Sequence, residues 1–189
     1  MKNKPELLPV RVVGDKVLRK KAAEVEKNSE ELQDFIKDLI FTMYKDDGVG
    51  LAAPQVGRSE RIFVVDPYWY REGHSKNPLV FINPEFKEFS GEDIDDEGCL
   101  SVPEIYAKVP RAESVIIEAL NEKFEKVRYE ADGFFARSLQ HEYDHLDGIL
   151  FIDKVAPLQK IMFAKKVKEL EALTDANGVN IKRKEYEDN

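Results

Sequence analysis

The sequence contains a single cysteine, Cys99, and only three histidines. One cysteine cannot form an intramolecular disulfide, so Cys99 is either a buried filler or a working thiolate. No stretch approaches the roughly 20 apolar residues that a membrane-spanning helix requires. Residues 1–14 mix charged residues with short apolar pairs and lack the continuous apolar core of an export signal. These absences predict a cytoplasmic protein that does not associate with membranes.

Positive charge is also scarce, with 29 lysines and arginines against 37 aspartates and glutamates and a formal net charge of -8. A protein that binds nucleic acid along an extended basic face has the opposite balance, so we expect no sequence-specific contact with nucleic acid. The length of 189 residues, 42% of them hydrophobic, suits one globular domain with its own core. We predict a single domain over residues 1–173, followed by a polar, frayed tail over residues 174–189.

Hydrophobic periodicity predicts three helices. The clearest covers residues 29–46, where apolar side chains recur at helical spacing after Ser29, a residue type that favours the N-cap position. A second helix is expected over residues 132–145 and a third over residues 157–170. Short segments rich in β-branched residues predict strands at 61–66, 79–82, 114–120 and 124–129. Because no strand alternates regularly with a helix, we expect an α+β fold rather than a parallel sheet.

The segment Gly48-Val-Gly-Leu-Ala-Ala-Pro-Gln55 begins with the G-x-G-x-x-[GA] pattern of dinucleotide-binding turns. Such a turn follows a strand and opens a helix, whereas these glycines follow the first predicted helix. Pro54 comes too early for the helix that would have to follow, and no lysine stands where a P-loop needs one. We therefore do not expect this segment to bind a nucleotide.

The strongest chemical pattern is Gln140-His-Glu-Tyr-Asp-His145, within the second predicted helix. Residues four apart on a helix share one face, so His141 and His145 can bind one metal ion at about 2.0–2.1 Å. Glu142 lies beside them, where it would contact the water of such a metal rather than the metal itself. The third histidine, His74, stands in a polar loop and is expected to face solvent.

A catalytic metal site needs a third protein ligand, and the sequence offers two kinds of candidate. Glu169 and Glu171 follow the histidines in the chain, but they stand among lysines on a helix face that should be solvated. Cys99 lies in the short segment 97–101, and a metal would hold its thiol as a thiolate. A lone cysteine is more commonly buried and inert. Spacing alone leaves both interpretations of Cys99 open.

Three segments taken together resemble the peptide deformylase family, namely residues 48–55, 97–101 and 140–145. They occur in the family's order at similar intervals, and the likeness extends from about Val10 to Leu170. The resemblance implies antiparallel sheets packed around a central helix that carries the HExxH motif, followed by a C-terminal helix. It also implies hydrolysis of the formyl group from the N-terminal methionine of newly synthesised peptides, with release of formate.

The resemblance implies a role for each site residue. Glu142 would accept a proton from water and pass it to the leaving nitrogen. The Gln55 side-chain amide and the Leu100 backbone N–H would stabilise the oxyanion. The metal would be Fe²⁺, with zinc, nickel or cobalt able to replace it. Its ligands would be Cys99, His141 and His145.

The resemblance further implies a pocket for the methionine side chain beside a backbone that pairs with the substrate like an added strand. Glu97 and Arg111 resemble the family's structural ion pair behind Cys99. Asp95 and Tyr106 stand where many bacterial members carry an apolar residue and an arginine, a departure that concerns side-chain preference rather than chemistry. The substrate-binding residues would be Val49, Gly50 and Phe134.

Two other functions fit parts of the sequence. A small metallopeptidase would use Glu169 as its third ligand. A peptide-binding module without activity would keep the pocket, although the presence of Glu142 and Gln55 argues against it. N-formylmethionyl peptides are the expected partner. A transient ribosome contact is a further hypothesis, to which a solvated helix face is an equal alternative, and it is based on the lysines 154, 160, 165, 166 and 168.

Overall fold

The first predicted helix forms as expected in the computed structural model, which describes residues 4–181. Helix α1 covers Glu30–Lys45, and the Ser29 hydroxyl accepts a hydrogen bond from the Leu32 N–H at 3.1 Å, which caps the first turn. The apolar stripe of α1 is buried, with Leu39 and Met43 fully enclosed in a core cluster against the first strands of the sheet. Burial of this stripe fixes the end of α1 next to the glycine-containing segment.

The larger sheet has antiparallel strands in the order β1-β2-β3-β6-β7. All the predicted strands are present, although β3 and β7 run further than expected. The strand β1 is not predicted, because its three residues are too few to show an alternation. It lies at the edge of this sheet, so within residues 4–181 only β2 pairs with it. The strands are β1 (Gly50–Ala52), β2 (Ile62–Val65), β3 (Leu79–Ser90), β6 (Ser114–Leu120) and β7 (Lys126–Asp132).

A smaller sheet consists of β4 (Asp93–Cys99) and β5 (Val102–Arg111), which form an antiparallel hairpin. Neither strand is predicted from the sequence, because β4 is mostly acidic and β5 contains a proline near each end. The alternate residues of β5 are buried in a second core cluster, including Ile105 and Val109. The hairpin turns directly after Cys99, which places the thiol at the end of a strand.

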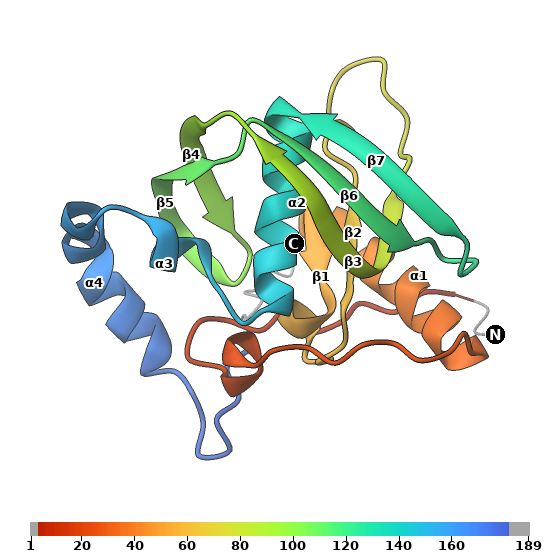
Figure 1. Cartoon of the computed structure of the whole chain (residues 1–189). Coiled ribbons are helices and arrows are strands. Elements are labelled where there is room, and N and C mark those ends of the chain that lie inside the picture. The colour runs from red at the N-terminus through yellow and green to blue at the C-terminus, as the bar shows by residue number, and fades with distance from the viewer. Residues whose placement is uncertain (1–3, 182–189) are drawn as a thin grey trace.

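Helix α2 (Gly133–Leu146) crosses between the two sheets and occupies the centre of the molecule (Figure 1). It carries the HExxH pattern and confirms both the second predicted helix and the central position that the family resemblance implies. Its apolar side chains Leu139 and Leu146 are fully buried in a third core cluster with Phe63 and Phe81 of the larger sheet. Both sheets thus hold α2 in place.

The chain after α2 forms α3 (Phe151–Lys154) and α4 (Pro157–Glu171), the second of which confirms the third predicted helix. Short 3-10 helices, η1 (Lys16–Arg19) and η2 (Ala53–Val56), complete the elements. None of the helices in residues 4–181 combines the length and the hydropathy needed to cross a membrane.

The prediction of a frayed tail is wrong for residues 174–181. Asn180 is buried, and its side-chain amide donates hydrogen bonds to the carbonyl oxygens of Val13 and Leu170 at 2.9 and 2.8 Å. Its backbone N–H donates to the Asp15 carboxylate at 3.0 Å. These contacts fasten the segment to the N-terminal region, which periodicity alone does not reveal. The remainder of the predicted tail, residues 182–189, lies outside the described residues.

Candidate metal centre

The fold brings the three predicted metal ligands together from two elements. Cys99 ends β4, whereas His141 and His145 project from one face of α2. The Sγ atom of Cys99 lies 3.3 Å from Nε2 of His145, and a ligand atom from each of the three residues lies within 4.8 Å of the others. Glu169 and Glu171 remain exposed on α4, outside this group. The cysteine is therefore the third candidate ligand that the fold supplies.

Glu97 orients the first histidine. Its Oε2 atom lies 2.9 Å from Nδ1 of His141, which leaves Nε2 of the same ring as the free ligand atom. Arg111 donates to both carboxylate oxygens of Glu97, from Nε at 2.8 Å and from Nη2 at 2.9 Å. This bidentate pair agrees with the ion pair expected behind Cys99. It holds the carboxylate, and through the carboxylate the imidazole, in one orientation.

The ion pair belongs to a larger buried network that the sequence does not predict. Arg137 donates to Oε1 of Glu97 and to the Asp93 carboxylate, both at 2.8 Å. Arg111 also donates to the carboxylate of Asp144, on the last turns of α2. Arg137 stands four residues before His141, so the shared helix face is a signal that could have pointed to it. Asp144 offers no comparable signal, because its partner is 33 residues away in sequence.

The network and the burial set the charges around the centre. Burial opposes ionisation of Glu97, but hydrogen bonds from Arg111 and His141 outweigh it and hold the pKa of that carboxyl well below its ordinary value. Burial disfavours a charged His141, yet its contacts with Cys99 and Glu97 raise its pKa well above the ordinary value. Burial, together with the nearby His141, lowers the pKa of His145 well below its ordinary value.

Glu142 faces the same centre from α2 and is buried. Burial raises its pKa to about 7, and a catalytic acid or base works best with a pKa near the working pH. A Cβ atom on residue 50 would lie only 2.5 Å from Oε1 of Glu142. A side chain at position 50 would therefore displace the Glu142 carboxylate, which approaches β1 closely.

Gln55 reaches the centre from η2. Its Nε2 lies 3.4 Å from the Cys99 sulfur and 3.3 Å from the Ser101 hydroxyl, while its Oε1 accepts a hydrogen bond from the Ala52 N–H at 2.8 Å. The bond to Ala52 fixes which end of the amide faces the metal centre. The side chain therefore presents a donor beside the thiol.

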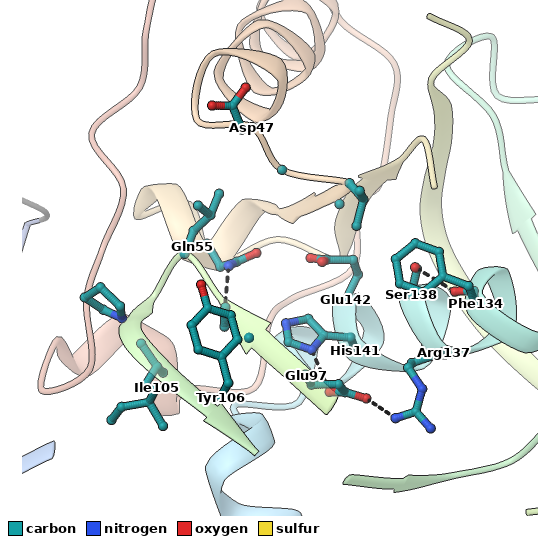
Figure 2. Close-up of a pocket in the computed structure, with 18 of the residues that line it drawn as sticks. Asp47, Gln55, Glu97, Ile105, Tyr106, Phe134, Arg137, Ser138, His141 and Glu142 are labelled. Atoms are coloured by element: carbon teal, nitrogen blue, oxygen red, sulfur yellow. Dashed lines mark hydrogen bonds and ion pairs between the residues drawn. The ribbon is translucent and has the colours of Figure 1, made fainter. Parts of the chain in front are cut away.

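A cavity of about 430 Å³ opens onto this centre. It includes the predicted substrate residues Val49, Gly50 and Phe134, together with Leu100. Figure 2 shows the Gln55 amide and the Glu142 carboxylate directed toward one another, with Tyr106 and His141 nearby. The Tyr106 ring covers Gly98, where a Cβ would lie 2.5 Å from a ring carbon. Polar groups not expected from the sequence also line the cavity, namely Arg137 and Ser138.

The loop between β2 and β3 forms hydrogen bonds with the glycine-containing segment, residues 48–55. The Trp69 indole N–H donates to the Gly48 carbonyl oxygen at 2.9 Å, and the Asp66 N–H donates to the Val49 carbonyl oxygen at 2.8 Å. The Lys76 ammonium lies over the Trp69 ring, 5.0 Å from its centroid. This loop, which carries no recognisable motif, was not singled out from the sequence. It restrains the backbone that lines the cavity.

The donor set suits one transition-metal ion. A thiolate and two imidazole nitrogens are the ligands that bind zinc and ferrous iron in proteins. Among residues 4–181, the buried polar atoms without a hydrogen-bond partner include Oε2 of Glu142. Such atoms are costly unless a bound group or its water satisfies them. The Cys99, His141 and His145 site therefore fits a metal with Glu142 beside it.

A partly buried Cys/His/His centre in an α+β fold, with a neighbouring buried glutamate at an open cavity, is the arrangement of a small metal-dependent hydrolase. The sequence profile described as Polypeptide deformylase matches residues 7–161. The chain therefore belongs to the peptide deformylase family.

Curated relatives agree with this assignment. The chain is 52% identical over 145 residues to the peptide deformylase of Clostridium botulinum, covering 77% of this chain and 94% of that protein. It is 44% identical over 162 residues to the peptide deformylase of Thermodesulfovibrio yellowstonii, covering 86% and 97% of the two proteins.

Solved structures show the same fold. The peptide deformylase of Thermotoga maritima superposes with a TM-score of 0.75 at 44% identity, covering 80% of this chain and 99% of that one. The enzyme of Acinetobacter baumannii, solved with Met-Ala-Ser bound, superposes with a TM-score of 0.73 at 40% identity, covering 79% and 99%. This chain is accordingly a hydrolase that removes the N-formyl group from the N-terminal methionine of newly synthesised peptides and releases formate.

Proposed function

We propose that the reaction takes place at the Cys99, His141 and His145 centre, with Fe²⁺ as the metal and the three side chains as its ligands. The observation that carries this proposal is the convergence of a β-strand thiol with two imidazoles of α2. Sulfur and nitrogen donors alone suit zinc and ferrous iron about equally. The family resemblance favours iron, and nickel, cobalt and zinc are the expected substitutes. When bound, the ion supplies Lewis acidity toward the formyl carbonyl and lowers the pKa of water.

Glu142 is the proposed general base and acid. Its carboxylate takes a proton from the water that attacks the formyl carbon and delivers it to the leaving nitrogen, so that formate and a free amine result. The pKa of about 7 supports this cycle, because the group can both gain and lose a proton near neutral pH. Its unpartnered Oε2 atom is available for the water.

Gln55 and the Leu100 backbone N–H are the proposed donors to the oxyanion that develops on the formyl oxygen. In the structure the Gln55 amide donates to the Cys99 sulfur and the Ser101 hydroxyl, at 3.4 and 3.3 Å. The contact with the hydroxyl is long for an N–H···O hydrogen bond, so the amide can exchange it for a stronger hydrogen bond to a negative oxygen.

The methionine side chain occupies the cavity against Val49, Gly50 and Phe134, and the peptide backbone pairs with the free edge of β1. Charged groups at the cavity floor do not exclude it, because Arg137 is already neutralised by Glu97 and Asp93. The unbranched thioether suits a site that mixes aliphatic stems and partnered charges.

An anaerobic assay tests these proposals. The metal-free protein is reloaded separately with Fe²⁺, Ni²⁺, Co²⁺ and Zn²⁺, and formate release from formyl-Met-Ala-Ser is followed. We expect turnover with each of the first three and the fastest with iron. Absence of formate with all of the metals would instead favour a peptide-binding module without activity.

The alternative of a metallopeptidase is separated by two variants. Cys99→Ala should abolish tight metal binding, whereas Glu169→Ala should leave the metal content unchanged, because Glu169 is exposed on α4. Metal content of the purified proteins is the measurement. The reverse result would make Glu169 the third ligand.

We also propose a cytoplasmic location and a transient ribosome contact, since newly synthesised chains are the substrate. The lysines of α3 and α4 are the candidate surface, although Lys166 is paired with Glu104 at 2.6 Å and Lys154 with Asp144 at 2.9 Å. Lys160→Glu combined with Lys168→Glu should weaken cosedimentation with ribosomes at low salt. Unchanged cosedimentation would remove α4 from this role.

A further inference from the structure

A second cavity of about 300 Å³ lies between β5 and α4, and we call it the β5–α4 groove. It is continuous with the catalytic cavity, because Glu104, Ile105 and Tyr106 line both. The side chains of α4 that line it include Gln159, Met162, Phe163 and Lys166. The groove therefore begins where the catalytic cavity opens and continues along the outer side of β5.

The outer edge of β5 is a strand edge without a strand partner. In the described part of the chain β5 pairs only with β4. At Lys108 the edge is covered by the Gln159 side chain, whose amide donates to the Lys108 carbonyl oxygen at 3.3 Å and accepts from its N–H at 3.1 Å. A side-chain amide in this position imitates the peptide group of a neighbouring strand. Gln140 makes the same pair of bonds with Ala112, at 2.9 and 3.0 Å.

Beyond Gln159 the same edge is open. Alternate residues of a strand direct their backbone groups to the same edge, so Tyr106 presents its N–H and C=O on the side that Lys108 does. Glu104 has a φ of 63°, so the regular alternation ends before it. These two residues line the groove. An open strand edge of this kind is a template for an added peptide strand.

Apolar side chains stand beside the open edge. Tyr106 is 76% exposed and Met162 is 79% exposed, and both border the groove. Large apolar side chains so exposed, next to unpaired backbone groups, are typical of peptide-binding surfaces. At the far end, Lys166 and Glu104 form an ion pair across the groove at 2.6 Å.

We propose that the β5–α4 groove binds the formylated chain downstream of its first residues, in an extended conformation that pairs with the β5 edge at Tyr106. The formylated chain is the proposed occupant because the groove is continuous with the catalytic cavity. A chain whose formyl end is bound in that cavity leaves it past Tyr106. An extended chain advances about 3.3 Å per residue, so a few further residues reach α4. This inference rests on the proposed placement of the reaction at Cys99, His141 and His145.

Two peptides and two variants test the proposal. The peptides are formyl-Met-Ala-Ser and a formylated nonapeptide with the same first three residues and apolar residues after them. Met162→Glu places a charge in the groove. Ile161→Glu is the matched control, because Ile161 is the preceding residue of α4, is 72% exposed and does not line the groove.

We expect the wild-type protein to have a higher kcat/KM for the nonapeptide than for the tripeptide. Met162→Glu should remove about tenfold of that advantage, an order of magnitude consistent with losing the burial of one methionine. It should leave tripeptide turnover unchanged, and Ile161→Glu should alter neither value. A nonapeptide N-methylated at its downstream amides should lose the advantage on the wild-type protein, because N-methylation removes the donors that pair with a strand edge.

Several results would overturn the proposal. They are equal kcat/KM for both peptides on the wild-type protein, equal effects of the two variants, or a full advantage for the N-methylated peptide. A change of oligomeric state caused by Met162→Glu would assign the groove to a second copy of the chain instead. Absence of tripeptide turnover by the wild-type protein would refute the proposed function itself. The tripeptide measurement therefore distinguishes failure of the proposed function from failure of the groove proposal.

Discussion

The two sides of the metal centre differ in how their polar groups are satisfied. Behind the ligands, Glu97 receives hydrogen bonds from Arg111, Arg137 and His141, all at 2.8–2.9 Å. On the cavity side, Oε2 of Glu142 is buried without a hydrogen-bond partner among residues 4–181. The contacts behind the ligands fix the orientation of the site, whereas the Glu142 oxygen on the cavity side remains available to contact a water or the substrate. A buried carboxylate oxygen without a partner is energetically costly, and the protein keeps one where a water and a substrate are proposed to bind. The Glu97 carboxylate behind the ligands is instead fully hydrogen-bonded.

A substitution on the cavity side should have its largest effect on catalytic activity. Glu142→Gln keeps the volume of the side chain but cannot transfer the proton, so kcat for formyl-Met-Ala-Ser should fall by about 10²-fold or more. The metal content should stay at the wild-type level, because Glu142 is not a ligand. Turnover near the wild-type rate with metal bound would remove Glu142 from the mechanism.

A substitution behind the ligands should lower both the free energy of unfolding and the metal affinity. Glu97→Gln leaves Arg111 and Arg137 buried without their shared counter-charge, which should cost about 3–5 kcal/mol of unfolding free energy. It also frees the His141 ring, and metal affinity should fall by about 10–100-fold.

Urea unfolding and competition with a chelator measure the two effects of Glu97→Gln. Glu85→Gln, at an exposed ion pair with Lys87, is the matched control and should change neither value measurably. A Glu97→Gln protein with wild-type stability would show that the network is not what holds this side.

The pH dependence of stability sharpens the same comparison in the metal-free protein. Burial raises the pKa of Glu142 from 4.5 to about 7, so the folded state binds this proton more tightly than the unfolded state does. The resulting penalty is absent below pH 4.5, grows as the pH rises toward 7 and is constant above it. Glu142→Gln should therefore stabilise the metal-free protein at pH 8 relative to pH 5, by about 3 kcal/mol at most. An identical difference between the two proteins at both pH values would contradict this.

The smallest effect is expected behind the glycine-containing segment. Trp69→Phe removes the hydrogen bond to the Gly48 carbonyl oxygen and should weaken kcat/KM by a factor corresponding to about 1 kcal/mol. Since this bond positions the backbone that pairs with the peptide, the loss should appear in KM rather than in kcat. Tyr70→Phe, a neighbouring change at an exposed ring, is the control. A loss confined to kcat would argue against this positioning role.

Helices α1 and α4 show how far sequence reasoning reaches into the fold. Both are predicted from periodicity, and both form. In α1 the apolar stripe is buried as expected, but in α4 Ile161 and Met162 are exposed and only Leu170 is fully buried. The period of a sequence indicates a helix without stating which neighbour will cover it. The unpredicted strands β1, β4 and β5 are short, acidic or interrupted by proline, and their partners stabilise them more than their own residues do.

The sequence by itself determined the helix that carries His141 and His145, because a spacing of four residues has a direct geometric meaning on a helix. Spacing left Cys99 undecided, and the resemblance across three segments was needed to nominate it. Only the tertiary structure decided that the thiol and the network behind Glu97 converge on one helix, and that Trp69 contacts the backbone beside the cavity. Those contacts join residues 14 to 46 positions apart or lie in loops without a period, and local patterns carry no information about them.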